Sequence, residues 1–273
     1  MKTFSPLRYP GGKTFLTSLI IETILDKKNV STFIEPFAGG AGVSLFLLLN
    51  NYVDQIFIND SDYLIFCIWD SILNETDKFV RRIEDTPVTI EEWQKYSNLL
   101  ADEQTFFSQD KFQIGFGAFF LNRCNRSGMI KKSVGPIGGK SQTGKWKVDA
   151  RFNKLGLISK IRKIAEQKDN IFLSNKDAVT FLKESLIDIQ KTFVYLDPPY
   201  YDKGEQLYRK YFCDADHINL FNYLNTHREF HWMVSYDNSS FIRNLYRDFS
   251  LREIQVKHYA YQSHNGIELI IEN

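Results

Sequence analysis

Five short apolar segments recur along this chain, and each of them ends in polar or small residues. Runs of this length that are bounded by turn residues are typical of buried strands. Stretches with helical spacing separate most of them, and strands that alternate with helices predict an α/β fold with a mostly parallel, doubly wound, Rossmann-like sheet. The five segments are Thr32–Ile34, Gln55–Asn59, Asn170–Ser174, Thr192–Leu196 and His231–Ser235. Two later segments, Phe249–Lys257 and Glu268–Glu272, are expected to pair as a terminal antiparallel couple.

Apolar residues that recur every three or four positions predict the helices. The expected helices are Thr14–Leu25, the stretch "VSLFLLLN" from Val43, Leu64–Leu73, Phe79–Ile83, Ile90–Leu100, Phe112–Arg123, Lys154–Gln167, Val179–Ile189 and His217–Leu224. Phe112, Phe116, Phe119 and Phe120 have helical spacing and are expected to be core residues. The interval 61–169 interrupts the alternation of strands and helices. We therefore expect residues 1–60 and 170–273 to form the sheet domain, and residues 61–169 to form an inserted, largely helical subdomain.

The net charge of +1 conceals a strong internal asymmetry. Residues 50–110 hold 13 acidic and 4 basic side chains, whereas residues 122–163 hold 12 basic side chains and one acidic side chain, Asp149. The basic interval is interleaved with Gly, Ser, Asn, Gln and Trp146, which is typical of a loop that meets phosphates and reaches base edges. A solvated face is the alternative, but so one-sided a run favours nucleic acid as the partner.

Composition excludes several other classes of protein. Cys67, Cys124 and Cys213 show no C-x-x-C spacing, which argues against a disulfide framework and fits a reducing cytosol, so a cytoplasmic location is expected. The five histidines are scattered without ligand spacing, so no metal site is expected. There is no signal-peptide pattern and no apolar run of about 18 residues, so no membrane span is expected.

Polar residues follow each predicted strand, and in such sheets ligands bind at the carboxyl ends of the strands. After the first strand comes the loop Glu35-Pro36-Phe37-Ala38-Gly39-Gly40-Ala41-Gly42, which lacks the third glycine of G-x-G-x-x-G. Asp60 stands where an acidic residue would bond ribose hydroxyls. Glu35 would repel a pyrophosphate, so the loop favours a nucleoside without phosphates, such as S-adenosylmethionine. The alternative is a tight structural turn between a strand and a helix.

The stretch "LRYPGGKTFL", Leu7–Leu16, contains Gly-Gly-Lys-Thr, the ending of a phosphate-binding loop. That pattern needs a glycine six positions before Lys13, where the chain has Leu7, and it should follow a buried strand, which is missing here. The stretch is therefore not an NTPase loop. A turn before a helix, with Lys13 solvated, is the alternative that remains open at this point.

The stretch "LDPPY", Leu196–Tyr200, is the most specific signal in the chain. Two prolines at the end of a buried strand cannot continue the ladder, so the carbonyls of Asp197 and Pro198 remain free to accept hydrogen bonds. A carboxylate, a fixed carbonyl and an aromatic ring form a receptor for a planar amine: the two oxygens take the N–H protons and the ring stacks on the base. An ordinary proline-rich turn is the alternative.

Taken together, these stretches resemble the Dam-type DNA adenine-N6 methyltransferases. The matching stretches are "LRYPGGKTFL", "FIEPFAGGAGVSLFLL", "FINDSD", "FFLNRCNRSGMI", "FVYLDPPY" and "GIELIIEN", in the order of the family. The resemblance implies a methyltransferase sheet with an inserted target-recognition subdomain, and a methyl transfer from S-adenosylmethionine to adenine N6 in duplex DNA after base flipping. The segment "NRSGMIKKSVGPIGGKSQTGKWK" is longer and richer in Gly and Lys than the hairpin of the GATC-reading members, so the recognition sequence stays open.

The resemblance also implies roles for individual residues. The residues expected to bind the target adenine are Asp197, Pro198, Pro199 and Tyr200. The residues expected at the cofactor are Tyr9, Gly12, Lys13, Glu35, Phe37, Ala38, Gly39, Asp60, Asp177 and Asp197, with Asp60 on the ribose and Asp177 on the adenine amine of the cofactor. The residues expected on DNA are Arg123, Asn125, Arg126, Ser127, Lys131, Lys132, Lys140 and Lys145.

The expected partner is double-stranded DNA, a cognate restriction endonuclease is an open candidate, and a monomer is favoured. Three rival functions remain. An RNA guanine-N2 methyltransferase would also use Asp-Pro-Pro-Tyr, but the N-terminal Gly-Gly-Lys and the basic insertion argue against it. A non-enzymatic DNA-binding or cofactor-sensing protein is disfavoured by the intact Asp-Pro-Pro-Tyr. A nicotinamide dehydrogenase would need the missing glycine fingerprint.

Overall fold

The computed structural model describes residues 3–9, 11–27, 29–186, 188–202, 204–207, 209–258 and 264–273. The chain divides into two compact units. A sheet unit contains Lys13–Ser61 and Asn170–Asn273, and a helical unit contains Asp62–Asp169 together with the segment before Lys13. The sequence placed that N-terminal segment with the sheet domain, whereas in the structure it groups with the helical unit.

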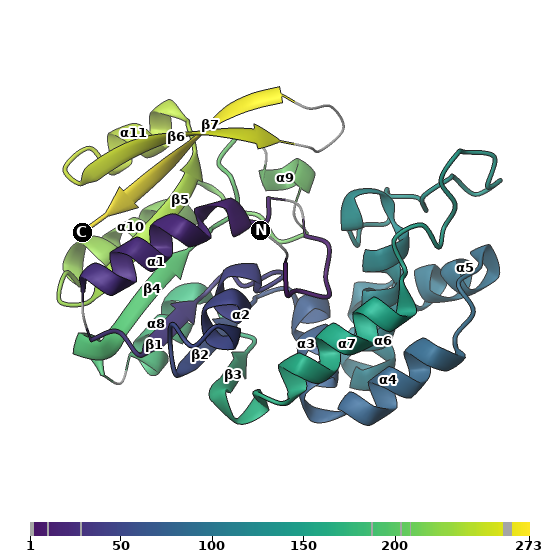
Figure 1. Ribbon diagram of the computed structural model, residues 1–273. Helices are drawn as coiled ribbons and strands as arrows, with labels where there is room; N and C mark the ends of the chain where they lie inside the picture. Colours follow the sequence, from purple (N-terminus) through teal and green to yellow (C-terminus); the bar gives the residue numbers. More distant parts are fainter. Residues whose placement is uncertain are drawn as a thin grey trace. The chain divides into compact units, whose positions relative to one another are not determined.

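The sheet unit is built on seven strands in the part of the chain that the structure describes, and it has the α/β class predicted from the sequence (Figure 1). The strands are β1 Thr32–Glu35, β2 Gln55–Asn59, β3 Ile171–Ser174, β4 Thr192–Leu196, β5 His231–Asp237, β6 Ser250–His258 and β7 His264–Glu272. Their order is β3-β2-β1-β4-β5-β7-β6. The pairs among β1 to β5 are parallel, and β7 is antiparallel to both β5 and β6, as predicted for the terminal couple.

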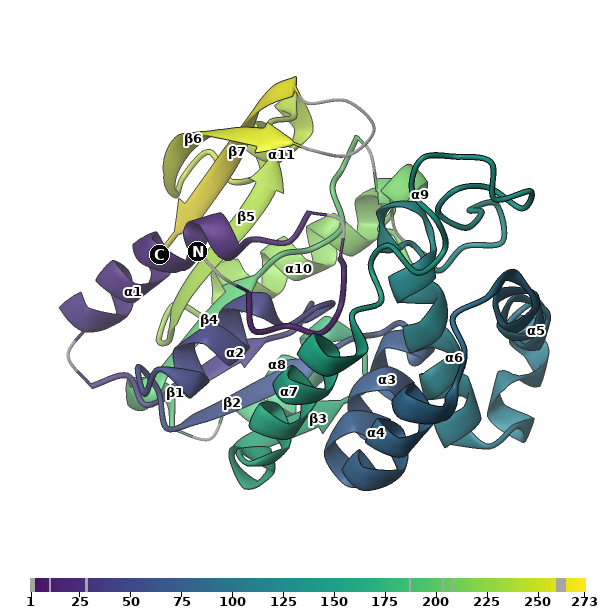
Figure 2. The same ribbon diagram turned by 45° about the vertical axis from the view of Figure 1, so that its right-hand side comes forward.

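Helices cover both faces of this sheet (Figures 1 and 2). One face carries α1 (Thr17–Asp26), which follows a short 3-10 turn at Thr14–Leu16, and α2 (Gly42–Leu49). The other face carries α8 (Ala178–Ser185), α10 (Asp214–Thr226) and α11 (Ser240–Leu245). Because both faces of the sheet are covered, every residue of β4 is buried. Its sequence is therefore an apolar run, without the alternation of apolar and polar residues that a half-exposed strand shows.

The helices of the sheet unit and the turn that leads into β3 differ from the prediction at several places. The helix predicted to reach Ile189 ends at Ser185, and a 3-10 turn follows at Ile189–Lys191. The short helices α9 (Gly204–Leu207) and α11 were not predicted, since four and six residues are too few to display a helical period. A further 3-10 turn, Lys168–Asn170, leads into β3.

Helix α6 (Lys111–Cys124) is the central helix around which the helical unit packs. The helices of this unit are α3 Tyr63–Asn74, α4 Thr76–Asp85, α5 Ile90–Leu99, α6 Lys111–Cys124 and α7 Lys154–Ala165, with 3-10 turns at Glu103–Ser108 and Arg126–Gly128. The four phenylalanines of α6 are at most 2% exposed, so the prediction that they are core residues is confirmed. Gly115 of α6 lies against α3, where a Cβ would meet the carbonyl oxygen of Cys67 at 2.3 Å.

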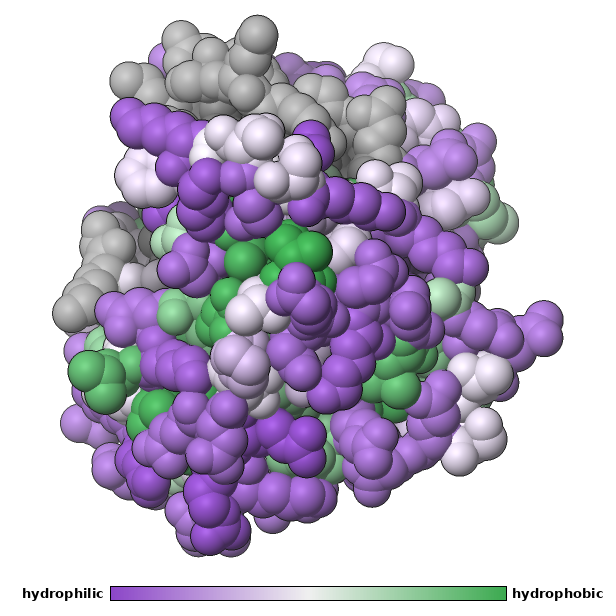
Figure 3. Space-filling view, turned by 90° about the vertical axis from the view of Figure 1, so that its right-hand side faces the viewer, coloured by the Kyte–Doolittle hydropathy of each residue, from purple (hydrophilic) through white to green (hydrophobic). Residues whose placement is uncertain are grey.

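One face of the structure is largely polar. Figure 3 shows that hydrophilic side chains prevail on this face, with patches of hydrophobic side chains between them. No helix in the described part of the chain combines the length and the apolar character needed to cross a bilayer.

Candidate active site

The strand order brings two distant loops together at one edge of the sheet. β1 pairs with β2 on one side and with β4 on the other, so the direction of winding reverses between β1 and β4. Such a reversal is where open α/β sheets bind their ligands, at the carboxyl ends of the strands. Ile34 of β1 is level with Val194 of β4, so the loop after β1 and the Asp-Pro-Pro-Tyr stretch after β4 start side by side.

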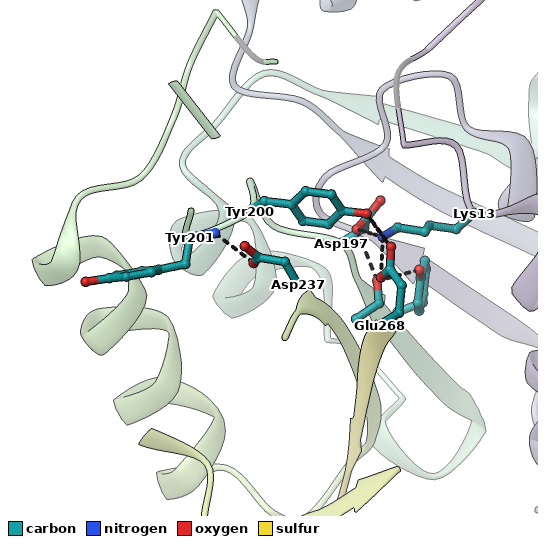
Figure 4. A network of polar contacts seen from close by, with 8 residues as sticks. Lys13, Asp197, Tyr200, Tyr201, Asp237 and Glu268 are labelled. Carbon is teal, nitrogen blue, oxygen red and sulfur yellow. Dashed lines mark hydrogen bonds and ion pairs between the residues drawn. The ribbon is translucent and has the colours of Figure 1, made fainter. Parts of the chain in front are cut away.

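Asp197 leaves the end of β4 with its carboxylate in a polar cluster (Figure 4). Its Oδ1 lies 3.1 Å from Lys13 Nζ and accepts a hydrogen bond from Ser235 Oγ at 3.1 Å. The pKa of Asp197 is raised to about 6: burial is the main cause and the charge of Glu268 adds to it, whereas Lys13 and Ser235 partly offset the rise. The carboxyl group therefore titrates closer to neutrality than an ordinary aspartate.

Lys13 connects Asp197 to two other groups of the site. Its Nζ donates to Tyr200 Oη at 2.9 Å and to both carboxylate oxygens of Glu268 at 2.9 and 2.8 Å. Lys13 is buried, so the solvated-turn interpretation of its stretch does not hold. One ammonium group thus faces two carboxylates and a phenol.

Glu268 is a member of this site to which sequence reasoning assigned no role. It lies within β7 opposite Asp237 of β5, is 1% exposed, and also accepts a hydrogen bond from the Tyr200 hydroxyl. Burial, followed by the charges of Glu268 and Asp197, raises the pKa of Tyr200 well above its ordinary value, so the phenol stays neutral. An acid inside the otherwise apolar run "IELII" was the available signal, because a buried strand seldom carries an unpaired charge.

The turn after Tyr200 is held from β5. Asp237, the last residue of β5, accepts hydrogen bonds from the backbone N–H of Tyr201 at 2.8 Å and of Asp202 at 2.9 Å (Figure 4). The ring of Tyr201 stacks on Phe241 with the centroids 4.4 Å apart. These contacts fix the backbone direction in which the chain leaves Tyr200.

The loop after β1 turns sharply with the help of its small residues. Gly39 and Ala41 both have positive φ, 46° in each case. The N–H of Gly39 donates to Asp60 Oδ2 at 2.9 Å, and the N–H of Ala38 donates to the Asn59 carbonyl oxygen at 2.8 Å. The loop is therefore tied to the end of β2. Phe37 is half-buried with its ring edge-on to Phe212.

Glu35 is buried at the start of this loop and accepts hydrogen bonds from the hydroxyl and the N–H of Ser44 in α2. The pKa of Glu35 is raised to about 8: burial is the main cause and the nearby charges of Asp197 and Asp60 contribute, whereas the hydrogen bonds from Ser44 partly offset the rise. Three carboxyl groups thus share a poorly solvated region, which favours a cationic ligand.

The ends of β2 and β3 are joined by Asn59 and Asn175. Asn59 Nδ2 donates to the carbonyls of Pro36 and Lys176, both at 3.0 Å, and its Oδ1 accepts from Lys176 N–H at 2.8 Å. Asn175 Nδ2 donates to the Asp60 carbonyl at 2.7 Å. Asp177 is exposed, and its Oδ1 caps α8 through two backbone N–H groups.

Tyr9 and Gly12 belong to the helical unit, where Gly12 N–H donates to the Tyr9 carbonyl at 3.3 Å. Their part in binding a cofactor stays a prediction. The same holds for the roles that the resemblance gave to the residues around the loop after β1. No cluster of His, Cys, Asp and Glu suited to a metal ion occurs among the residues that the structure describes.

The residues expected on DNA occupy two kinds of environment in the helical unit. Arg123 donates to the carbonyls of Arg151 and Pro6, and Asn125 is 1% exposed, where it accepts from Trp93 Nε1 at 2.7 Å and donates to the Met129 carbonyl at 2.8 Å. These two side chains thus hold the fold of the segment together. The side chains of Arg126, Lys132, Lys140 and Lys145 are exposed, whereas Ser127 and Lys131 are half-buried.

The chain is similar to known DNA methyltransferases. A model of the D12 class N6 adenine-specific DNA methyltransferase family matches residues 9–259. The type II methyltransferase M.MjaIII of Methanocaldococcus jannaschii is 24% identical over 275 residues, which cover 92% of this chain and 90% of that protein. The type II methyltransferase M.CviBI of Paramecium bursaria Chlorella virus NC1A is 24% identical over 270 residues, which cover 95% and 92%.

A solved structure, the rRNA methyltransferase aviRa from Streptomyces viridochromogenes, aligns over 97% of this chain and 85% of its own chain. Its sequence identity is 10% and its TM-score is 0.39, and at these values the likeness says nothing about function.

Proposed function

The chain belongs to the D12 class N6 adenine-specific DNA methyltransferase family, and on that premise we propose that it methylates N6 of an adenine flipped out of duplex DNA, with S-adenosylmethionine as donor. The observation that carries the proposal is the convergence of Lys13, Asp197 and Tyr200 at the carboxyl end of β4, beside the loop after β1.

The acceptor amine is oriented by oxygen atoms of the chain. The Asp197 carboxylate and the Pro198 carbonyl accept the two N–H bonds of the adenine amine, and the Tyr200 ring stacks on the base. With both protons directed into acceptors, the nitrogen lone pair leaves conjugation with the ring and points at the methyl group. The N–C bond forms as the S–C bond breaks, and the methylated amine loses one proton. Asp197, with a pKa of about 6, can take that proton.

The loop after β1 and its acidic neighbours fit the donor. S-adenosylmethionine supplies an electrophilic methyl group on a positively charged sulfur. Glu35, Asp60 and Asp197 form an acidic region in which burial, with smaller contributions from the charges of Asp197 and Asp60, raises the pKa of Glu35 to about 8. A sulfonium and an ammonium group would relieve that repulsion. We assign Asp60 to the ribose hydroxyls and Asp177 to the adenine amine of the donor.

The exposed cations of the basic segment, Arg126, Lys132, Lys140 and Lys145, are the proposed contacts to duplex DNA. The two curated relatives are type II methyltransferases by name, which supports a site-specific enzyme that works with a cognate restriction endonuclease. The proposed location is the cytoplasm, where that DNA substrate would lie.

The test is a transfer assay with radiolabelled S-adenosylmethionine, followed by mass spectrometry of nucleosides from digested duplex DNA. N6-methyldeoxyadenosine is expected with the wild type. Asp197→Asn should abolish transfer while calorimetry still detects the donor, because the amide has the size of the carboxyl group and lacks its charge. Methylguanine in structured RNA, without product in DNA, would overturn the proposal.

A further inference from the structure

Residues 137–148, here called the Gln142 loop, form a closed loop in the basic segment of the helical unit. Gln142 Nε2 donates to the carbonyls of Ile137 at 2.8 Å and Gly139 at 2.6 Å, and its Oε1 accepts from the N–H of Val148 at 2.8 Å. One side chain thus joins the beginning and the end of the loop. Val148 is buried and anchors the loop in the unit.

Gly138 allows the closure. Its φ is 83°, and a Cβ at this position would lie 2.5 Å from the Trp146 carbonyl oxygen. The N–H of Gly144 also donates to the Gly138 carbonyl, at 3.4 Å. The loop is therefore folded upon itself in a way that holds the backbone of Trp146 in place.

The side chain of Trp146 points out of this closed loop. It is 65% exposed, whereas Trp69, Trp93 and Trp232 are at most 4% exposed. Lys145 Nζ lies 5.7 Å from the centre of its ring, and Lys140 is exposed nearby in sequence. An indole kept in water forgoes the stabilisation that burial of such a large ring would give.

We propose that Trp146 stacks on a base of the bound DNA and that the Gln142 loop is a preformed platform which presents it. The inference rests on the proposed function, because flipping one adenine out of the stack bares the faces of the neighbouring base pairs and of the orphaned partner base. Lysines beside the ring meet the phosphates and the ring meets a bared face, the combination by which proteins bind unstacked bases of single-stranded nucleic acid irrespective of sequence.

The difference in exposure between Trp146 and the other tryptophans makes tryptophan fluorescence an intrinsic probe of this loop. Since the other three are buried, iodide should quench chiefly Trp146 in the free protein. Addition of a duplex that carries the target site should quench the same emission and shield it from iodide. A Trp146→Phe variant, which keeps an aromatic ring, should lose this signal yet bind duplex DNA nearly as well as the wild type.

Affinity measurements separate stacking from charge. Trp146→Ala should weaken duplex binding about 5- to 140-fold, the range for one base–aromatic stack, at every salt concentration. The slope of log affinity against log salt should stay unchanged, because stacking releases no counterions. Lys145→Gln should instead flatten that slope. Phe107→Ala is the matched control, since Phe107 is 77% exposed but lies in an acidic segment, and it should not alter duplex binding.

The outcomes distinguish this inference from the proposed function. If Trp146→Ala binds duplex like the wild type, or if duplex leaves the emission of the wild type unchanged while adenine methylation proceeds, the stacking role is refuted and the enzyme assignment stands. If structured RNA quenches Trp146 and duplex DNA neither quenches it nor is methylated, both are refuted.

Discussion

Replacing Glu268 with glutamine tests whether the buried charge cluster organises the site. The substitution keeps the size of the side chain and removes its charge. Lys13 would lose the carboxylate that now accepts two of its hydrogen bonds, at 2.9 and 2.8 Å, and Tyr200 would lose a charged acceptor. Removal of one partner from a buried ion pair costs about 3–5 kcal/mol when the other charge is left uncompensated. Because Lys13 keeps Asp197 at 3.1 Å, a loss near the lower end of that range is expected, which in urea corresponds to a denaturation midpoint lower by about 1 M.

The same substitution changes the chemistry in a predictable direction. Glu268 raises the pKa of Asp197, which is about 6 in the wild type. Without it, Lys13 turns to Asp197 alone, the pKa of Asp197 falls, and the amine of the substrate competes with Lys13 for the carboxylate. In a plot of the methyl-transfer rate against pH, the fall of the rate on the acid side should therefore move below pH 6. The rate above this pH range should drop about 100-fold, as expected when reacting groups are displaced by about an ångström.

Transfer rates between pH 5 and 8 and urea melts followed by circular dichroism would measure both effects. Glu253→Gln is the matched control: Glu253 lies on the neighbouring strand β6 in an exposed pair with Arg243, which is worth less than about 1 kcal/mol. A Glu268→Gln protein with the urea midpoint and the pH profile of the wild type would refute the reasoning.

Three further changes probe the same unit. Asp60→Ala should weaken S-adenosylmethionine binding by about 1.5–3 kcal/mol, measured by calorimetry, since it removes a charged acceptor; unchanged affinity would make Asp60 purely structural. Because the pKa of Glu35 is higher in the folded state (about 8) than its ordinary 4.5, the cofactor-free protein should lose stability as pH rises from 4.5 through 8. Glu35→Gln should make that slope shallower, above all between pH 6 and 8, where the raised pKa of Asp197 (about 6) contributes little, and an identical slope would contradict the assignment. Asp237→Asn, which leaves the Tyr201 or Asp202 N–H without its acceptor, should lower kcat about tenfold with donor affinity intact; a change in donor affinity instead would argue against a positioning role.

The sequence was most informative where local pattern and burial agree. β2 and β4 were predicted at their observed limits, because both are apolar runs between turn residues in a sheet covered on both faces. The placement of Asp197 followed from the end of β4. Parallel strands share one edge, so the order of the loops along the chain was enough to predict that their polar residues gather there.

Contacts between segments that are far apart in the sequence could not be predicted from local patterns. Lys13 and Glu268 are 255 positions apart, and it is the pairing of β7 between β5 and β6 that brings Glu268 to the site; the acid within "IELII" marks the residue as unusual but does not say which cation it meets. The same limit applies to Asn125. Its sequence neighbours are basic, yet its side chain bonds Trp93 and Met129 inside the helical unit.

A buried ion pair is weak evidence for stability. A double substitution can therefore test whether Lys13 and Glu268 serve the stability of the fold or the reaction. Replacing such a pair with apolar side chains of similar volume is often neutral or stabilising by about 1–4 kcal/mol. Lys13→Met combined with Glu268→Leu should therefore recover at least half of the stability lost in Glu268→Gln. Asp197 would then lack its cation, its pKa would rise above 6, and methyl transfer at pH 7 should be lost although the protein is folded. Urea melts and transfer assays on both variants decide the matter. If the double variant is less stable than the single one, the pair serves the fold. If it still methylates DNA, Lys13 has no part in the reaction. Folded but inactive protein would show that the charges are kept for the amine-binding site.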